Sequence, residues 1–211
     1  MDSINYAAQE LKAHTGITFV ASQAIFNSVQ LDLLGFDIDS IVATGYTLTH
    51  TYNDTVIDIQ ISPAVSLNDS IQLWIYYHGA PAKDVSGWGG FYFTGAYAFN
   101  LGVGFDANPH NFGRAWFPCI DNFTSRSSYD FYITTSNGSK AFCNGLLQST
   151  ITNPNGTLTW HWKLNQTIPS YLASMAVAPY FTLERTSNGL PVEWAATPSD
   201  TINILNTFRK S

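Results

Sequence analysis

The chain has 211 residues, of which 45% are hydrophobic and only 11% are charged, and its formal net charge at pH 7 is −6. This hydrophobic content excludes a disordered chain, and the length allows one large β domain or two small domains. The sequence has no cluster of Lys and Arg and no run of 18 apolar residues, so it lacks the usual signals for nucleic-acid binding and for a transmembrane helix. Its charged fraction lies well below the roughly 25% of an average soluble domain, which is more typical of secreted or surface β proteins than of cytosolic enzymes.

Short runs of alternating apolar and polar residues fill the first half of the chain and predict β-strands. The expected strands cover residues 15–20, 27–33, 36–44, 46–52, 56–61 and 70–78. The last of these has bulky residues on both faces, which predicts a central strand. Residues 7–13 are a candidate helix.

The second half continues in the same rhythm, beginning with residues 91–99, which are aromatic on both faces. Further strands are expected at residues 129–134, 146–152, 157–164, 173–178, 181–186 and 190–196. Residues 146–164 predict a hairpin around a turn at 153–156. Thr197, Pro198 and Asp200 then have the order of an N-cap, a first helical residue and a first-turn acid. The sequence therefore predicts an all-β fold, an antiparallel β-sandwich, with the start of a helix at its C-terminal end.

The segment 113–122 is the densest combination of chemically distinctive residues in the chain. It contains Arg114, Trp116, Phe117, Pro118, Cys119 and Asp121. Because proline cannot donate to a sheet ladder, we expect a strand that breaks here, or an edge segment. A buried arginine needs a carboxylate partner, so Arg114 and Asp121 are predicted to form an ion pair.

The two cysteines, Cys119 and Cys143, leave two alternatives open. They are either separate buried thiols or a disulfide, which would close a loop and contribute about 3 kcal/mol in the chain-entropy model.

Tryptophans also admit two interpretations, because exposed rings can stack on sugars whereas buried rings fill a core. The residues concerned are Trp88, Trp116, Trp160, Trp162 and Trp194. Trp160 and Trp162 share a strand face with leucines, which favours the core.

The pattern Arg114-x-x-Phe117-Pro118-Cys119-x-Asp121 resembles a signature of the aminopeptidase N family of zinc metallopeptidases. Further similar motifs follow the family's order: Gly89-Gly90-Phe91-Tyr92-Phe93, Cys143-Asn144-Gly145, Thr159-Trp160 and Pro169-Ser170-Tyr171-Leu172. The resemblance covers roughly residues 4–196. In that family the signature lies in the N-terminal β domain, so the resemblance implies a saddle-shaped β domain at residues 1–196. Residues 197–211 would then begin the linker and helix that lead to a catalytic domain.

Catalytic zinc in this family requires a His-Glu-x-x-His helix, in which two imidazoles lie one helical turn apart. None of the five histidines of this chain belongs to such a motif. We therefore expect no catalytic residue, metal ligand or cofactor in this chain and no hydrolysis by it alone. The resemblance implies that zinc is held by the catalytic domain of the same polypeptide. Asp54, Asp69 and Asp84 lie in separate loops and are interpreted as turn-forming residues.

One loop has a functional counterpart in the family. A segment rich in Gln and Glu, just before the signature arginine, reaches the cleft there and helps to hold the free amine of the peptide substrate. The corresponding residues 106–112 contain neither Gln nor Glu, and Asn108, His110 and Asn111 are the candidate substitutes. The alternative is a plain surface loop.

The leading hypothesis is therefore the non-catalytic N-terminal domain of an exported zinc metallo-aminopeptidase, located in the periplasm, at the cell surface or outside the cell. It would pack on the catalytic domain, form a wall of the cleft and contact the peptide substrate at the cleft edge. The alternatives are a carbohydrate-binding β-sandwich module, favoured by the low charge and the tryptophans, and a free-standing β domain that mediates protein contacts.

Overall fold

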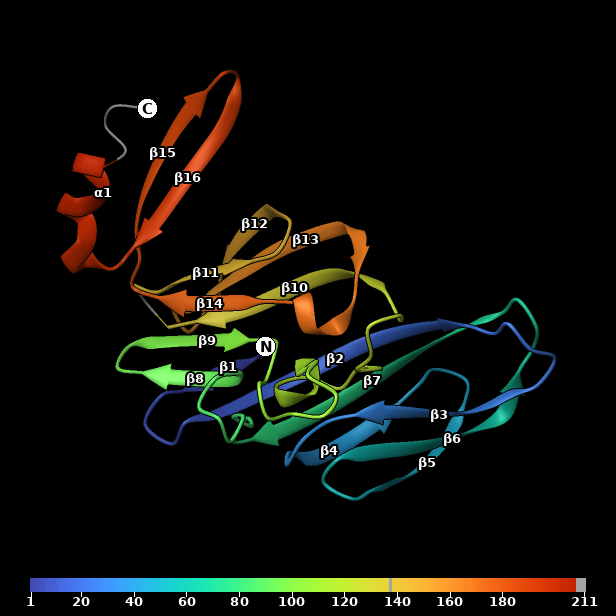
Figure 1. Ribbon diagram of the computed structural model, residues 1–211. Helices are drawn as coiled ribbons and strands as arrows, with labels where there is room; N and C mark the ends of the chain where they lie inside the picture. The colour runs from blue at the N-terminus through green and yellow to red at the C-terminus, as the bar shows by residue number, and fades with distance from the viewer. Residues whose placement is uncertain (137, 208–211) are drawn as a thin grey trace.

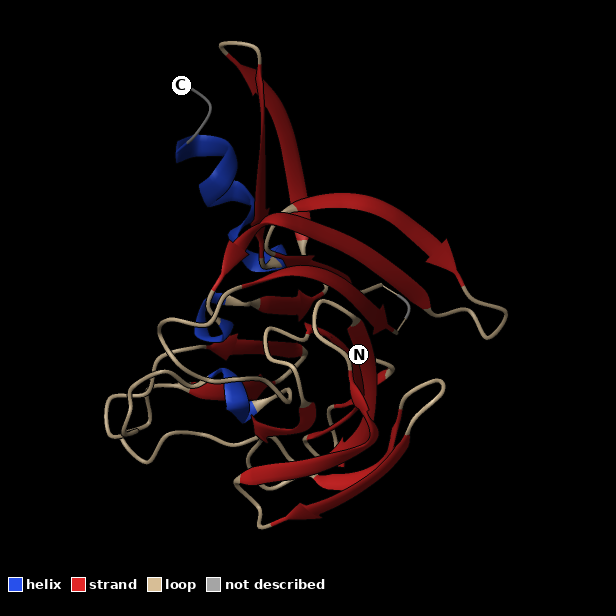
Figure 2. Ribbon diagram, turned by 90° about the vertical axis from the view of Figure 1, so that its right-hand side faces the viewer, coloured by secondary structure: helices blue, strands red, loops and turns tan. Residues whose placement is uncertain are grey.

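The computed structural model describes residues 1–136 and 138–207. Strands make up most of the fold, and the helical segments are short (Figure 2). The strands of the first half are β1 (Ser3–Asn5), β2 (Glu10–Val20), β3 (Phe26–Asp32), β4 (Asp37–Val42), β5 (Thr47–Tyr52), β6 (Val56–Val65), β7 (Ser70–Gly79), β8 (Gly90–Thr94) and β9 (Tyr97–Leu101). Those of the second half are β10 (Ser127–Thr135), β11 (Lys140–Cys143), β12 (Leu146–Thr152), β13 (Leu158–Ile168), β14 (Met175–Ala178), β15 (Phe181–Ser187) and β16 (Leu190–Ala196). The helical segments are η1 (Gly113–Ala115), η2 (Ser170–Leu172), η3 (Pro198–Asp200) and α1 (Thr201–Thr207).

Two antiparallel sheets lie edge to edge and form the broad layer of the domain. Their strand orders are β1-β2-β7-β4 and β10-β13-β12. Met1 joins them, because its amine donates to the Tyr132 carbonyl over 2.8 Å and its carbonyl accepts from the Thr134 amide over 3.0 Å. Strand β7 has a partner on each side, which confirms the predicted central strand.

Two smaller sheets, β3-β6-β5 and β11-β14-β9-β8, share a hydrophobic core with the broad layer (Figure 1). Along β7 the residues Ile71, Leu73, Ile75 and Tyr77 are buried, whereas Tyr76 on the other face is 38% exposed. This alternation means that the broad layer has one face in the core and one face toward solvent. The predicted all-β antiparallel fold is confirmed.

The helix predicted at residues 7–13 is wrong. The chain turns up to Gln9, which has a φ of 56°, and β2 begins at Glu10. Leu11 and Ala13 are both buried and lie opposite Gly79 and Tyr77 of β7. The long ladder with β7 supplies hydrogen bonds and burial that an isolated short helix would lack, so tertiary pairing overrides local propensity.

Most other predicted elements are close to those observed. The single run predicted at residues 91–99 is wrong, because the chain turns at Gly95, whose φ is +60°, and forms the hairpin β8–β9. The predicted hairpin of β12 and β13 is confirmed, and its Trp162 is buried with the indole N–H on the Ala141 carbonyl at 2.9 Å. The ribbon β15–β16 stands off from the body (Figure 1), and Pro198 begins the helical segment as predicted. Residues 208–211 of the predicted C-terminal segment lie outside the described residues.

Candidate functional site: a loop braced by Arg114 and Asp121

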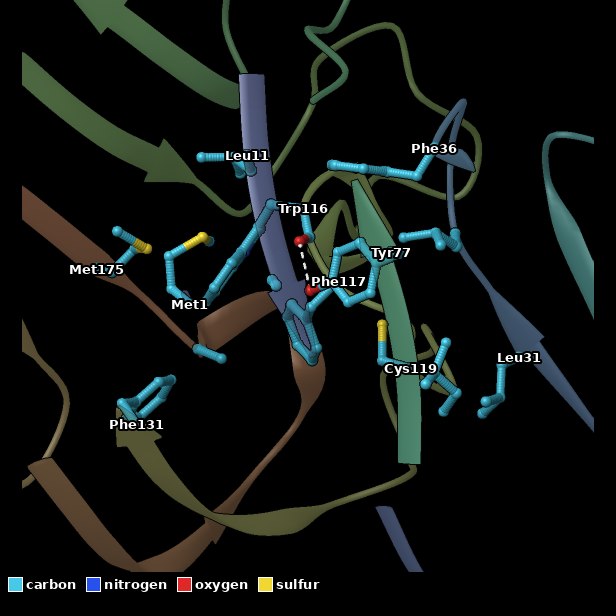
Figure 3. Packing of buried hydrophobic residues seen from close by; sticks show 14 of the residues in the cluster. Met1, Leu11, Leu31, Phe36, Tyr77, Trp116, Phe117, Cys119, Phe131 and Met175 are labelled. Atoms are coloured by element: carbon cyan, nitrogen blue, oxygen red, sulfur yellow. Dashed lines mark hydrogen bonds between the residues drawn. The ribbon is translucent and has the colours of Figure 1, made fainter. Parts of the chain in front are cut away.

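Trp116 and Phe117 carry the signature segment into the hydrophobic core. Their rings meet edge to face with centroids 4.7 Å apart, and both side chains are less than a tenth exposed. The Tyr77 hydroxyl donates to the Trp116 carbonyl over 3.1 Å and so links the segment to the central strand β7 (Figure 3). This segment is therefore anchored by aromatic packing rather than by a sheet ladder.

The predicted broken strand is wrong, and the alternative of an edge segment is the one observed. The short helix η1 precedes the aromatic residues, and Cys119 then forms a single bridge with Asp32 at the end of β3. The Cys119 amide donates to the Asp32 carbonyl over 3.1 Å, and the Asp32 amide donates to the Cys119 carbonyl over 2.7 Å. Pro118 has no N–H, so a longer ladder cannot form through it.

The predicted ion pair between Arg114 and Asp121 is present. Arg114 Nη1 lies 3.1 Å from Asp121 Oδ2, and the Arg114 backbone N–H donates to the same oxygen over 3.1 Å. The Ser170 hydroxyl donates to Asp121 Oδ1 over 2.6 Å. The Asp121 side chain is 0% exposed and that of Arg114 is 14% exposed. Asp121 is thus a buried carboxylate whose charge is compensated by one cation and several hydrogen-bond donors.

Arg114 also holds the loop that precedes it. Its Nη1 donates to the Asn111 carbonyl over 3.0 Å, and its Nη2 donates to the Pro109 carbonyl over 3.4 Å. The Asn111 side-chain amide donates to the Asp121 carbonyl. A Cβ on Gly113 would lie 2.9 Å from the carbonyl carbon of Ser170, so the close approach requires glycine. One ion pair therefore fixes the loop against the domain body.

The candidate cleft residues occupy two different environments. Asn108 and His110 are exposed, whereas Asn111 is fully buried and braces the loop from inside. His110 Nδ1 lies 3.0 Å from the Gly104 carbonyl, and the Gly104 amide donates to the His110 carbonyl over 2.9 Å. Only Asn108 and His110 can therefore meet a molecule outside the domain, and their role at a substrate cleft stays a prediction.

Asp84 is a second residue that holds this loop, through the Asp106 amide. From the sequence it was interpreted only as a turn-forming residue. Its carboxylate is 6% exposed and accepts hydrogen bonds from the Ser86 amide at 3.0 Å, from the Ser86 hydroxyl and from the Asp106 amide at 3.1 Å. The hydrogen bond from the Ser86 hydroxyl, with those from backbone amides, lowers the pKa of Asp84. A Cβ on Gly104 would lie 2.5 Å from Asp84 Oδ2. The signal in the sequence was Gly104, which leaves room for this carboxylate.

We expect Asp84→Asn to reduce the acid sensitivity of the fold. Because the pKa of Asp84 is lowered on folding, its stabilisation is present above the unfolded-state pKa of about 4 and is lost as pH falls toward the folded value. The midpoint of urea unfolding, measured from pH 7 down to pH 2, should fall less steeply in Asp84→Asn than in the wild type. Ser86→Ala should give an intermediate slope, and identical slopes in all three proteins would contradict the assignment.

The two cysteines are free thiols, so of the two alternatives the structure has the separate thiols. Burial raises the pKa of Cys119, with the nearby carboxylates of Asp121 and Asp32 acting in the same direction. Burial also raises the pKa of Cys143. Both side chains therefore stay protonated at neutral pH and act as packing groups rather than nucleophiles.

Within residues 1–136 and 138–207, no group of three His, Cys, Asp or Glu side chains is placed to hold a metal ion. Three histidines instead lie beside carboxylates in separate places: His14 beside Asp2 at 2.9 Å, His161 beside Asp130 at 2.7 Å, and His78 beside Asp39 at 2.8 Å and Asp37 at 3.8 Å. In the same part of the chain, no helix has the length and apolar character needed to cross a membrane.

Comparison with known families gives a match to the Peptidase M1 N-terminal domain over residues 3–172. This chain belongs to that family. A search of curated protein sequences found no match.

Among solved structures, a two-domain M1 zinc metallopeptidase variant bound to L-tryptophan has a TM-score of 0.73 and 16% identity, over 93% of this chain and 48% of that chain. The M1 zinc metallopeptidase of Deinococcus radiodurans, bound as a variant to a Tyr-Ser-Ala substrate, has a TM-score of 0.73 and 17% identity, over 92% of this chain and 47% of that chain. The same enzyme without the variant has a TM-score of 0.71. These likenesses show the fold, and the present chain spans about half the length of these relatives.

Proposed function

We propose that this chain is the non-catalytic N-terminal domain of a zinc metallo-aminopeptidase. It packs on a catalytic domain of the same polypeptide and forms one wall of the cleft in which N-terminal residues are removed from peptides. The observation that carries this proposal is the family match over residues 3–172. The two-domain architecture of one relative and the peptide bound to another support it. Zinc, on this proposal, belongs to the catalytic domain.

The braced loop, residues 106–112, is the part of the wall that we assign to the substrate. Arg114, Asp121 and Asp84 hold this loop in place, so Asn108 and His110 present their side chains without a large ordering cost on binding. Neither residue carries the negative charge that would pair with a substrate ammonium group. We therefore assign them neutral hydrogen bonds at the cleft edge rather than a full amine anchor.

We also place the protein outside the cytoplasm, because charged residues account for only 11% of the sequence. Fusion of the natural leader region to a reporter that is active only after export tests this placement.

Activity of the complete polypeptide encoded by the gene tests the central proposal. Reading the frame past Ser211 should reveal a His-Glu-x-x-His segment, and the complete polypeptide should hydrolyse aminoacyl 4-nitroanilides in a chelator-sensitive manner. Residues 1–211 alone should be inactive. Asn108→Ala and His110→Ala should raise KM more than they lower kcat, since they remove binding contacts without touching the reacting atoms.

Removal of residues 1–196 is the matched control for the domain's role. We expect kcat/KM to fall at least about 100-fold, or the remaining domain to become insoluble, because a cleft wall and an apolar interface are lost. An isolated catalytic domain with unchanged kcat/KM would overturn the proposed role of this chain.

The carbohydrate-binding alternative loses most of the residues that favoured it. Trp116 and Trp162 are buried, and Trp160 is half-buried with its indole N–H on Thr135 Oγ1 at 3.0 Å. Trp88 is 52% exposed, but it stacks on Phe105 beside the braced loop. The geometry therefore favours the peptidase domain.

A further inference from the structure

The sheet β11-β14-β9-β8 has one face in the core and a second face of half-buried residues. Along β9, Ala98 is fully buried, whereas its neighbours Tyr97 and Phe99 are only half-buried. In β14 the same alternation places Val177 in the core and Ala176 on the opposite face. We define the aromatic face by its half-buried residues: Tyr92, Tyr97, Phe99, Phe142, Ala176 and Tyr180.

Rings on the aromatic face contact one another. Tyr92 stacks on Phe99 with centroids 5.4 Å apart, and Phe142 meets Tyr180 edge to face at 5.5 Å. Tyr97 approaches Tyr180 at 6.4 Å. Large aromatic side chains with limited rotational freedom are the residues that dominate buried centres of protein interfaces.

A small residue at the centre of this face leaves it hollowed. Ala176 is paired with Phe99 on one side and with Phe142 on the other. The hollow has a volume of about 450 Å³ and is bounded by these three residues and Tyr180, with Asn144 and Ser174 at its polar rim. A side chain of a partner can enter it without moving the sheet.

The ribbon β15–β16 starts and ends beside this hollow, because Ala196 at the end of β16 pairs with Phe181. Strand β14 ends at Ala178, Tyr180 lies on the aromatic face, and β15 begins at Phe181. The Lys140 ammonium donates to Thr182 Oγ1 over 2.6 Å and fixes the start of the ribbon. The ribbon β15–β16 is a two-stranded sheet that stands away from the body (Figure 1), and such ribbons are marginal without further partners.

The apolar surface continues from the aromatic face to the braced loop. The Tyr92 hydroxyl donates to the carbonyls of Gly87 and Gly89, each over 2.9 Å. Trp88, between these glycines, stacks on Phe105 with centroids 5.9 Å apart. Phe105 is 63% exposed and directly precedes the loop that contains Asn108 and His110.

We propose that the aromatic face is the docking surface for the second half of the polypeptide, the catalytic domain of the proposed function, on which this inference rests. The two-domain relative is about twice as long as this chain, and the segment after β16 starts beside Phe181, next to the lining residue Tyr180. Tethering makes docking intramolecular and raises the effective concentration of the second domain at this face. A domain docked here lies beside the braced loop, as a cleft wall requires.

Hydroxyl-radical footprinting of the complete polypeptide, compared with residues 1–211 alone, tests this surface. Modification of Tyr92, Tyr97, Phe99, Phe142 and Tyr180 should fall at least about fivefold in the complete polypeptide, as expected for residues buried by an interface core. Tyr76 and Tyr132, which are 38% and 48% exposed on the far face of the broad layer, serve as internal controls and should not change. Protection that instead appears in residues 1–211 as the concentration is raised would assign the face to a second copy and overturn the proposal.

Ala176→Arg supplies the matching variant, because it places a charged side chain in the hollow. In the complete polypeptide it should restore modification of the aromatic rings and lower kcat/KM at least about tenfold, whereas residues 1–211 carrying it should unfold at the wild-type temperature. Val42→Arg, at a 48% exposed position on the far face, should behave as wild type in both measurements. Chelator-sensitive activity without protection of the aromatic face would leave the proposed function standing and refute the docking surface.

Discussion

Replacing Arg114 by alanine is expected to lower the free energy of unfolding by about 3–5 kcal/mol. The substitution leaves Asp121 as a buried carboxylate, 0% exposed, without the guanidinium that lies 3.1 Å away, its cationic partner within the described residues. It also frees the carbonyls of Asn111 and Pro109, so the loop that carries His110 should become mobile. Urea unfolding monitored by tryptophan fluorescence gives the stability, and amide hydrogen exchange over residues 105–112 reports the loop.

An exposed ion pair provides the control for this substitution. Lys163 lies 3.4 Å from Asp130, and both side chains are about two-fifths exposed, so Lys163→Met should cost less than about 1 kcal/mol. Adding Asp121→Asn to Arg114→Ala removes the unpaired charge and should recover part of the loss. Equal stabilities of Arg114→Ala and Lys163→Met would show that the buried carboxylate finds another partner.

Phe117→Ala is expected to cost about 3–5 kcal/mol, because it removes a buried ring from a close-packed core. The Phe117 ring is 8% exposed and meets both Trp116 and Tyr129 edge to face, with centroids 4.7 Å and 6.3 Å away. Trp116 belongs to the signature segment and Tyr129 belongs to β10. The cavity left by the substitution would therefore lie between this segment and β10. Calorimetry and urea unfolding at neutral pH measure the loss.

Phe123→Ala is the matched control, since Phe123 is 50% exposed and its ring meets that of Tyr171 edge to face with centroids 5.3 Å apart. We expect its cost to stay below about 1.5 kcal/mol, the value of one aromatic contact at a partly solvated site. If the two variants lose the same stability, the signature segment is not the core plug that its burial indicates.

Both substitutions bear on the proposed function through the same loop. Arg114 holds the loop by hydrogen bonds to its carbonyls, and Phe117 anchors the following segment in the core. Loss of either side chain should therefore shift Asn108 and His110 from their positions. In a complete metallopeptidase we would then expect KM to rise along with the loss of stability.

The fold class could be predicted from alternation of apolar and polar residues, because in strands such as β7 only one choice of face buries every isoleucine and leucine. The Arg114–Asp121 ion pair could be predicted because these are the two charged residues near each other in the apolar segment 113–122, and a buried guanidinium needs a carboxylate partner. The family membership followed from motif order, and the match over residues 3–172 confirms it.

Three other features depend on contacts between distant parts of the chain. Residues 10–13 became strand because the edge of β7 offered a ladder, a contact with residues more than sixty positions away that no local pattern encodes. Asn111 is buried, whereas Asn108 and His110 are exposed, because the Arg114 guanidinium donates hydrogen bonds to the backbone carbonyls of Pro109 and Asn111 and so fixes the loop. The aromatic face arose only when β9, β11 and β14, which lie far apart in the chain, paired and placed Phe99, Phe142 and Ala176 on one surface.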